Sequence, residues 1–545
     1  MEFLLCALPI AYAKLIINNV DTMILIVQRT LKIMCMLLNC IVMPFVMLQY
    51  FKKQRRLPPI KNSLLLLSAT EIAEKIRRRE VSCVNVIGAF IERCKEVNPL
   101  LNAIVEDRFD IAIEEARTVD EFMAHTTKTE EELAQEMPLL GVPVTVKESI
   151  AVEGMSNTVG IKANVLCKAD HDATVVKMIR KAGAIILLVS NTPELCMFWE
   201  SDNYVTGATW NPYNTTRVAG GSSGGEAALL GAAASVLSIG SDIAGSIRIP
   251  ALFCGVFGHK PTACLIPVNG HKPGSTDENW IQYFKIGPLV RYAKDLPLIM
   301  NIICQPNVEH RFDQKISLKE LKFFYMDDCC PATSSINKDM KEAIKKLKTY
   351  IKTTYDVQVQ KAHLNDMKFA FDISVYFLTK LNVQDIPEEI NDIGPSKILV
   401  QFLKSCICMS SHTISTISFS LIRWIWSKFP KSYGQAVTEK KIALEKQFEE
   451  LLGENGVLIY PTFVSSSGYL YQSFPKTLNF TYVMIYNVLG MPATQCTMGL
   501  GKRGLPVGLQ IIAKRGNDHL TIAVAQEIEK AFGGWQIPPT CELQV

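Results

Sequence analysis

The chain has 545 residues, 48% of them apolar, and a formal net charge of +4. This length and apolar content can bury a large core, and the small net charge gives no electrostatic case for binding nucleic acid. Sixteen cysteines are scattered without a CxxC pair or a Cys/His metal spacing, so we expect reduced thiols, not a disulfide framework. With no phosphate-cradling loop either, the sequence predicts no metal and no cofactor.

The N-terminal segment is more apolar than the rest of the chain. The run Leu31–Tyr50 carries one charge, Lys32, and is long enough for a transmembrane helix despite Pro44. Because a basic cluster follows at residues 52–56, the positive-inside rule predicts a single-pass protein whose remaining chain faces the cytosol. Residues 1–58 are therefore predicted to be a hydrophobic membrane anchor with a basic linker.

Two other interpretations of this segment stay open. Residues Phe3–Ala13 end in Ala-Tyr-Ala like a signal peptide, although Glu2 precedes them and no basic residue does. The second interpretation is a buried amphipathic segment of a soluble protein. The long stretch with few charges argues against this interpretation.

Beyond the linker, helical and strand patterns alternate. Ser68–Glu71 has the form of a capping box that opens one or two amphipathic helices. We expect strands at Leu139–Lys147 and Ile185–Val189, and helices at Asp172–Ala182 and Gly224–Ala234. This alternation predicts an α/β layered core.

The stretch Arg217–Thr262 is rich in glycine, alanine and serine, yet its apolar run predicts ordered structure. Ser222 follows two glycines, and Ser246 follows Gly245, so each serine lies where a tight turn can open a helix. A helix start offers unpaired N–H groups, which suit a developing oxyanion.

Lys147 is the last residue of the apolar strand predicted at Leu139–Lys147. Burial of an ammonium group is unfavourable, so a lysine there either reaches solvent or loses its proton at an unusually low pH. A neutral lysine is a competent general base.

Several runs resemble the amidase signature family of serine hydrolases. They are GVPVTVKES (Gly141–Ser149), GGSSGGE (Gly220–Glu226) and SDIAGSIRIPALFCGVFGHKP (Ser241–Pro261), with C-terminal blocks at Asn487–Ala493 and Gly504–Gln510. The resemblance extends from about residue 65 to about residue 535. It implies a central mixed β-sheet covered by helices on both faces, here behind an N-terminal transmembrane segment, with residues 59–545 as the catalytic domain.

The resemblance also implies a catalytic set. Ser246 would be the nucleophile, Ser222 a bridging serine that follows a cis peptide bond, and Lys147 the base. Ser223 would support this network by a hydrogen bond. The oxyanion hole would be formed by backbone N–H groups of Ile243, Ala244, Gly245 and Ser246. The family often has glycine in place of Ala244, which puts the width of the pocket in doubt.

Asp242 and Arg248 flank Ser246 closely. We expect them to brace the turn as an ion pair, and the alternative is a pair of solvated charges. Cys254 and His259 are expected to be packing and turn residues.

One alternative makes Ser222 the nucleophile. Gly220–Gly224 fits the G-x-S-x-G elbow of α/β-hydrolases, which needs a hydrophobic strand before it and a histidine after it. The preceding residues are polar, and none of the downstream histidines has a distinctive setting in the sequence. A second alternative is a non-enzymatic, membrane-anchored interaction protein on an amidase scaffold.

The substrate is inferred from the apolar segments. The N-terminus and the stretch Ile398–Phe429, with Trp424 and Trp426 near basic residues, suggest a substrate from a lipid phase, so residues 397–430 are predicted to be a membrane-facing helical insertion. An ordinary core helix pair is the alternative.

Within the family, the N-terminus and the DIAGSIR form are most similar to the type 2 fatty acid amide hydrolases. This implies primary fatty acid amides and N-acylethanolamines as substrates, a membrane as partner, and leaves homodimer formation open. The runner-up is the glutamine-hydrolysing subunit of transamidosomes.

Overall fold

A mixed sheet of eleven strands forms the centre of the computed structural model, in the order β1-β3-β2-β6-β8-β7-β12-β13-β11-β9-β10. The structure describes residues 20–48, 51, 53–306, 308, 310–384, 395–406, 409–539 and 541–544. The strands of this sheet are β1 (Ile104–Asp107), β2 (Pro143–Lys147), β3 (Ile185–Ser190), β6 (Leu237–Asp242), β7 (Phe257–Lys260), β8 (Lys285–Val290), β9 (Lys322–Tyr325), β10 (Val359–Lys361), β11 (Gly456–Pro461), β12 (Ala493–Leu500) and β13 (Pro506–Ala513). A separate antiparallel ribbon pairs β4 (Trp210–Asn211) with β5 (Asn214–Val218).

The pairing of the strands brings two chain segments to one edge of the sheet. Strand β2 runs parallel to both β3 and β6, and β6 runs antiparallel to β8. All residues of β2, β3 and β6 are buried, as expected for parallel strands covered on both faces. The carboxyl ends of β2 and β6 therefore lie side by side.

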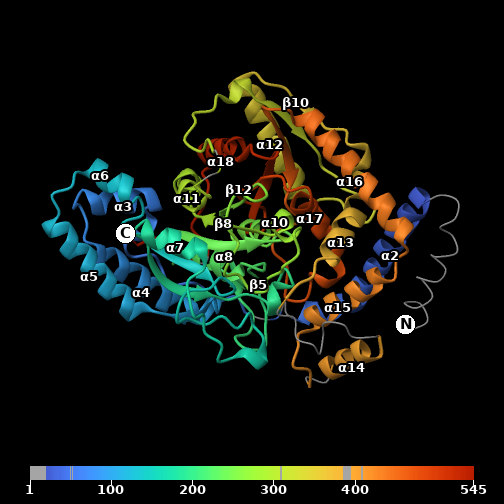
Figure 1. Ribbon diagram of the computed structural model, residues 1–545, viewed down its shortest axis with the longest axis horizontal. Helices are drawn as coiled ribbons and strands as arrows, with labels where there is room; N and C mark the ends of the chain where they lie inside the picture. Colours follow the sequence, from blue (N-terminus) through green and yellow to red (C-terminus); the bar gives the residue numbers. More distant parts are fainter. Residues whose placement is uncertain are drawn as a thin grey trace.

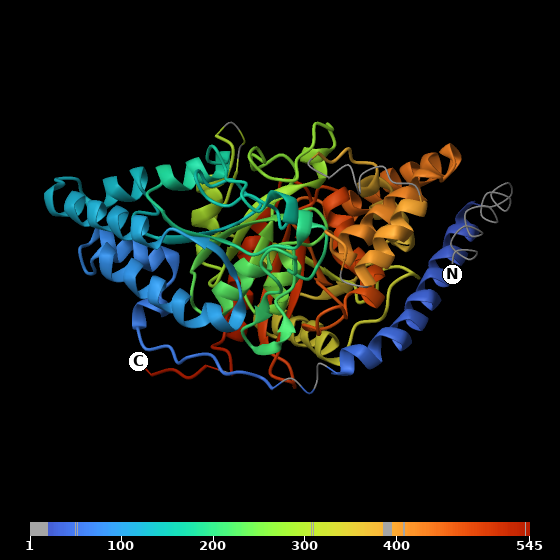
Figure 2. The same ribbon diagram turned by 90° about the horizontal axis from the view of Figure 1, so that it is seen from below.

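Helices lie on both sides of this sheet (Figures 1 and 2). The α-helices after the N-terminal one are α3 (Ala69–Arg77), α4 (Cys83–Leu101), α5 (Phe109–His125), α6 (Glu130–Glu136), α7 (Thr174–Lys181), α8 (Gly224–Gly231), α9 (Arg248–Phe253), α10 (Trp280–Tyr283), α11 (Asp295–Ile303), α12 (Lys338–Tyr355), α13 (Ala370–Thr379), α14 (Pro395–Cys406), α15 (Ile414–Ser427), α16 (Lys431–Leu452), α17 (Thr481–Val488) and α18 (Asp518–Phe532). Short 3-10 helices are η2 (Ser63–Leu66), η3 (Lys162–Asn164), η4 (Glu194–Cys196), η5 (Leu318–Glu320), η6 (Asn365–Phe369) and η7 (Phe474–Phe480).

The predicted elements are present, with shifted ends. The Ser68 capping box is confirmed, because Ser68 and Glu71 each accept a hydrogen bond from the other's backbone N–H at the start of α3. The strand predicted from Leu139 begins only at Pro143, since the residues before it form a turn around Gly141 at φ +71°. The predicted α/β class and the mixed sheet are confirmed.

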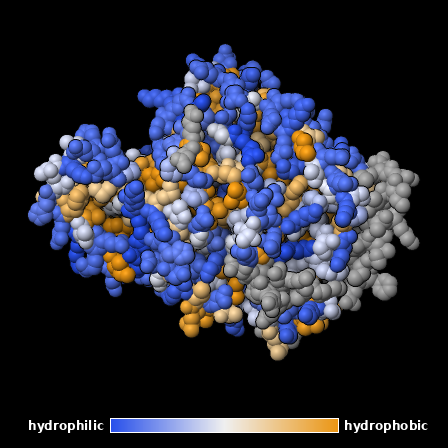
Figure 3. All heavy atoms as spheres, in the orientation of Figure 1, coloured by the Kyte–Doolittle hydropathy of each residue, from blue (hydrophilic) through white to orange (hydrophobic). Residues whose placement is uncertain are grey.

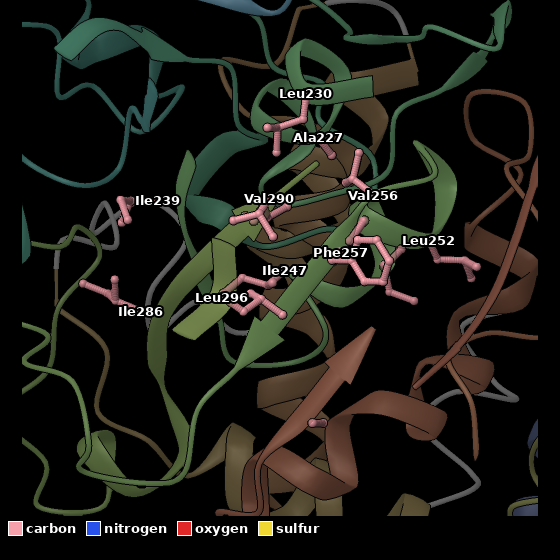
Figure 4. Close-up of a cluster of buried hydrophobic side chains, with 14 of the residues drawn as sticks. Ala227, Leu230, Ile239, Ile247, Leu252, Val256, Phe257, Ile286, Val290 and Leu296 are labelled. Atoms are coloured by element: carbon pink, nitrogen blue, oxygen red, sulfur yellow. The ribbon is translucent and has the colours of Figure 1, made fainter. Parts of the chain in front are cut away.

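Buried aliphatic and aromatic side chains from α8, β6, α9, β7 and β8 form the core beneath the glycine-rich stretch (Figure 4). Ala227 and Leu230 of α8 belong to this cluster, as do Ile247 beside α9 and Val290 of β8. Because α8 follows Ser222 and Ile247 follows Ser246, the cluster lies beside both serine turns. Cys83, Cys254 and Cys496 are free, buried thiols, in line with the expectation of reduced cysteines.

The N-terminal helix α2 (Val20–Leu48) starts earlier than predicted and lies against the rest of the chain (Figures 1 and 2). The segment Asp21–Val46 is long and apolar enough to cross a membrane. Gln28 is buried in this contact, where its Nε2 donates to Asp372 Oδ2 at 2.6 Å. The signal-peptide candidate Phe3–Ala13 and residues 49–50 of the predicted span lie outside the described residues.

The predicted insertion at residues 397–430 contains two helices, α14 and α15, which pack on each other. Away from α2, the face seen in Figure 3 is mostly hydrophilic, with apolar residues in small groups. Large apolar residues are exposed on α2 and α14, among them Ile33, Phe45 and Leu403.

Candidate active site

Lys147 lies at the carboxyl end of β2, fully buried, and contacts two serines. Its Nζ is 2.5 Å from Ser222 Oγ and 2.9 Å from Ser241 Oγ. Burial lowers the pKa of Lys147 below its ordinary value, although the nearby Cys196 thiol and the charges of Asp242 and Glu226 counteract this effect. Loss of the lysine proton is therefore easier here than in solvent, which is what the role of a base requires.

Ser222 lies in the glycine turn that leads into α8. The peptide bond between Gly221 and Ser222 is cis, the geometry implied by the family resemblance. Gly220 has φ +90°, and a Cβ there would come within 2.9 Å of Pro250 Cα, so this position requires glycine. The adjacent Ser223 donates its backbone N–H to the carbonyl oxygen of Ser246 at 3.1 Å, which ties the two serine turns together.

Ser246 lies in the turn between β6 and α9 and is almost fully buried. Gly245 before it has φ +100°, and a Cβ there would overlap the side chain of Val483. The N–H groups of Ile243, Ala244 and Ser246 bond to none of the residues that the structure describes. The N–H of Gly245 differs, because it donates to Asp242 Oδ1 at 2.7 Å. Of the four predicted oxyanion donors, three are thus unpaired in this conformation.

Asp242 and Arg248 form a completely buried ion pair, not a solvated one. Arg248 Nε and Nη2 each lie 3.1 Å from a carboxylate oxygen of Asp242. Burial by itself would raise the pKa of Asp242, but Arg248 outweighs it and holds this pKa well below its usual range. Arg248 also bonds to Asn487 and Gln510, so the C-terminal sequence blocks converge on the serine turn.

Sequence reasoning missed His271, which lies in the site. Its Nε2 is 3.0 Å from Ser241 Oγ and 2.9 Å from Ser149 Oγ. No local motif marks this histidine in the sequence, and only the fold brings it to the end of β6. His259, expected to be a packing residue, is buried and pairs with Asp518.

The elbow interpretation of Ser222 finds no support in this geometry. The strand before the turn, β5, belongs to the small ribbon and is not part of the central sheet. Within the described chain, the hydrogen-bond partner of Ser222 Oγ is Lys147, and no histidine takes that place. Among the residues that the structure describes, no group of three or more His, Cys, Asp or Glu side chains could hold a metal ion.

Comparison with known proteins identifies the family. The family model described as Amidase matches residues 85–522. Fatty-acid amide hydrolase 2-B of Danio rerio is 40% identical over 496 residues, covering 89% of this chain and 93% of the relative. Fatty-acid amide hydrolase 2 of Homo sapiens is 38% identical over 496 residues, covering 88% and 92%. A solved fatty acid amide hydrolase shares the fold, with a TM-score of 0.67 and 20% identity over 88% of this chain and 87% of its own. The resemblance seen in the sequence is confirmed, and the chain belongs to the amidase family of amide hydrolases.

Proposed function

We propose that this amide hydrolase cleaves primary fatty acid amides and N-acylethanolamines to a fatty acid and an amine, with Ser246 as nucleophile, Ser222 as relay and Lys147 as base. The observation that carries the proposal is the 2.5 Å contact between Lys147 Nζ and Ser222 Oγ in a buried site. The substrate class rests on the relatives named as fatty-acid amide hydrolases, at 38 and 40% identity.

The proton balance of the reaction assigns a task to each residue. Neutral Lys147 takes the hydroxyl proton of Ser222 while Ser222 takes that of Ser246, and Ser246 Oγ bonds to the amide carbonyl carbon. The proton then returns through Ser222 to the amide nitrogen as the C–N bond breaks, because an amine leaves poorly unless it is protonated. An acyl ester remains on Ser246. Water attacks this ester through the same relay and releases the fatty acid.

The developing oxyanion would be held by the N–H groups of Ile243, Ala244 and Ser246. Their lack of another partner among the described residues supports this role, and each important donor contributes about 3 kcal/mol. In this arrangement Gly245 instead anchors the turn through Asp242.

Aromatic side chains beside the oxyanion turn support an apolar acyl group. Trp199 Nε1 donates to the carbonyl oxygen of Ala244 at 2.8 Å, and its ring stacks on Phe480 with centroids 3.5 Å apart. Phe463 also stacks on Phe480, with ring centroids 4.8 Å apart. Apolar and aromatic walls with a few polar groups are typical of binding sites for apolar ligands.

We also propose that residues 1–58 attach the catalytic domain, residues 59–545, to a membrane. Large apolar side chains are exposed on α2 and α14, namely Ile33, Met36, Leu37, Ile41, Phe45, Leu399, Val400 and Leu403. The start of α15 is bonded to the segment beside the site, since Glu194 accepts from the Thr413 N–H at 2.7 Å and pairs with His412. This contact places the start of α15 next to η4, and we propose that a lipid substrate enters near α14 and α15. The single-pass topology, the cytosolic orientation and a homodimer stay predictions.

A hydrolysis panel on the purified full chain tests the proposal. We expect turnover of oleamide and an N-acylethanolamine, none of glutamine, and loss of both turnover and fluorophosphonate labelling in Ser246→Ala. Turnover of glutamine alone would favour the transamidosome-type alternative. Absence of labelling in the intact protein would favour an interaction scaffold.

A further inference from the structure

Ser241, the second-last residue of β6, lies between the proposed base Lys147 and the buried His271. Its Oγ is 2.9 Å from Lys147 Nζ and 3.0 Å from His271 Nε2. The imidazole of His271 is buried and lies against Phe284, with ring centroids 4.4 Å apart. A second serine contacts the same nitrogen, since Ser149 Oγ lies 2.9 Å from His271 Nε2.

The tautomer of His271 follows from its other nitrogen. Nδ1 lies 3.0 Å from the carbonyl oxygen of Pro273, which can only accept a hydrogen bond, so Nδ1 carries the hydrogen. Burial lowers the pKa of His271 to about 3, so the ring is neutral at physiological pH. Nε2 therefore has one lone pair, which the hydroxyl hydrogens of Ser149 and Ser241 share.

This direction determines what Ser241 can offer to Lys147. A serine that donates its only hydroxyl hydrogen to His271 can still accept, so Lys147 donates to Ser241. A neutral lysine has two N–H bonds and one lone pair. Ser241 takes one N–H, so the lone pair remains available to Ser222, whose Oγ lies 2.5 Å from Nζ.

We propose that His271 is a positioning residue: by holding the hydroxyl hydrogen of Ser241, it keeps the lone pair of Lys147 directed at Ser222. Without this acceptor, the Ser241 hydroxyl rotates and donates to the lone pair, in competition with Ser222. The inference rests on the proposed triad, because it concerns the base of that triad.

Two substitutions of similar polarity separate this role from packing. The side-chain amide of His271→Gln reaches the position of Nε2, where its oxygen can accept from Ser241. That of His271→Asn reaches only the position of Nδ1. We expect His271→Asn to lower kcat about tenfold, the factor that one net hydrogen bond is worth, with little change in KM. His271→Gln should stay within about threefold of the wild type by the same argument.

The readouts are kcat and KM for oleamide and the rate of fluorophosphonate labelling, each normalised to the titrated amount of reactive Ser246. Normalisation removes any unfolded fraction. In a Ser241→Ala background the competing hydroxyl is absent, so adding His271→Asn should have almost no further effect on kcat.

Three results would overturn the inference: full activity in His271→Asn, equal losses in the Asn and Gln variants, or an undiminished effect of His271→Asn in the Ser241→Ala background. These results differ from failure of the triad itself. If Lys147→Ala and Ser222→Ala keep their labelling and turnover, the proposed function is wrong. If those two lose activity and the His271 variants are alike, only the role of His271 is wrong.

Discussion

Lys147 is buried at the end of β2, where an ammonium group has lost its hydration shell, and this burial lowers its pKa. The sequence indicated such a lysine because it ends an apolar strand. Its partners could not be inferred in the same way: Ser222 comes from the turn before α8, Ser241 from β6, and His271 from a loop between β7 and α10.

Replacement of Lys147 by alanine tests the base directly. We expect Lys147→Ala to lower kcat by about 10²–10⁴-fold, the usual contribution of a general base. In the wild type, kcat/KM should rise with pH as Lys147 loses its proton, at lower pH than for free lysine, and this rise should be absent in the variant. Lys260, another buried lysine with a lowered pKa, supplies the control, because Lys260→Met should keep the rise. A pH profile of Lys147→Ala identical in shape to that of the wild type would contradict the assignment.

Gly245 tests the turn that carries Ser246. Its φ of +100° and the overlap of a Cβ with Val483 predict that Gly245→Ala destabilises the fold by about 1–3 kcal/mol and lowers kcat. Gly154, at φ +75° with nothing within 4 Å of a Cβ, is the matched control for backbone strain alone. Denaturant unfolding and kcat should both show a larger loss for Gly245→Ala. Equal effects would mean that contact with Val483 does not matter.

Among the secondary-structure elements, the Asp242–Arg248 pair connects β6 and α9 with α17 and β13. Arg248 bonds to Asn487 Oδ1 at 2.6 Å and to Gln510 Oε1 at 2.9 Å. This explains why sequence blocks more than two hundred residues downstream belong to the same site. Each block is recognisable in the sequence, but the contact between them depends on the neighbouring positions of β7, β12 and β13 in the sheet.

Loss of this connection should be costly because it leaves a buried carboxylate unpaired. We expect Arg248→Met to lower the free energy of unfolding by about 3–5 kcal/mol, measured by denaturant titration. Arg117 forms an exposed pair with Glu114, and Arg117→Met should change stability by less than about 1 kcal/mol. If the two variants lost the same stability, the buried pair would not be the brace that we describe.

For the whole molecule, the main question is how α2 lies on the catalytic domain. The helix is bonded to it by Gln28, whose amide contacts Asp372, and by Lys32, whose Nζ donates to the carbonyl oxygen of Thr333 at 2.7 Å. Other apolar residues of α2, such as Ile33, Ile41 and Phe45, stay exposed. A sequence pattern alone predicts a spanning helix of sufficient length and does not indicate that one polar residue within it is buried against a distant aspartate.

Substitution of Gln28 separates docking of α2 from membrane binding. Gln28→Leu removes a partner of Asp372 but leaves the exposed apolar residues in place. We expect faster amide hydrogen exchange in the first turns of α2, and unchanged sedimentation with phospholipid vesicles. Thr30→Ala is the control, because the Thr30 hydroxyl bonds within the helix, to the carbonyl oxygen of Ile26. Slow exchange in Gln28→Leu, as in Thr30→Ala, would show that this contact does not hold the helix.

The sequence by itself determined the α/β class, the capping of α3, the family and the candidate residues Lys147, Ser222 and Ser246, because these depend on local periodicity, turn chemistry and short motifs. Only the tertiary structure decided that His271 and Ser241 join the site and that the Gly245 N–H is bound by Asp242. Hydrogen-bond partners far apart in the chain depend on strand order and on the direction in which each turn presents its polar groups. No local pattern of residues encodes that information.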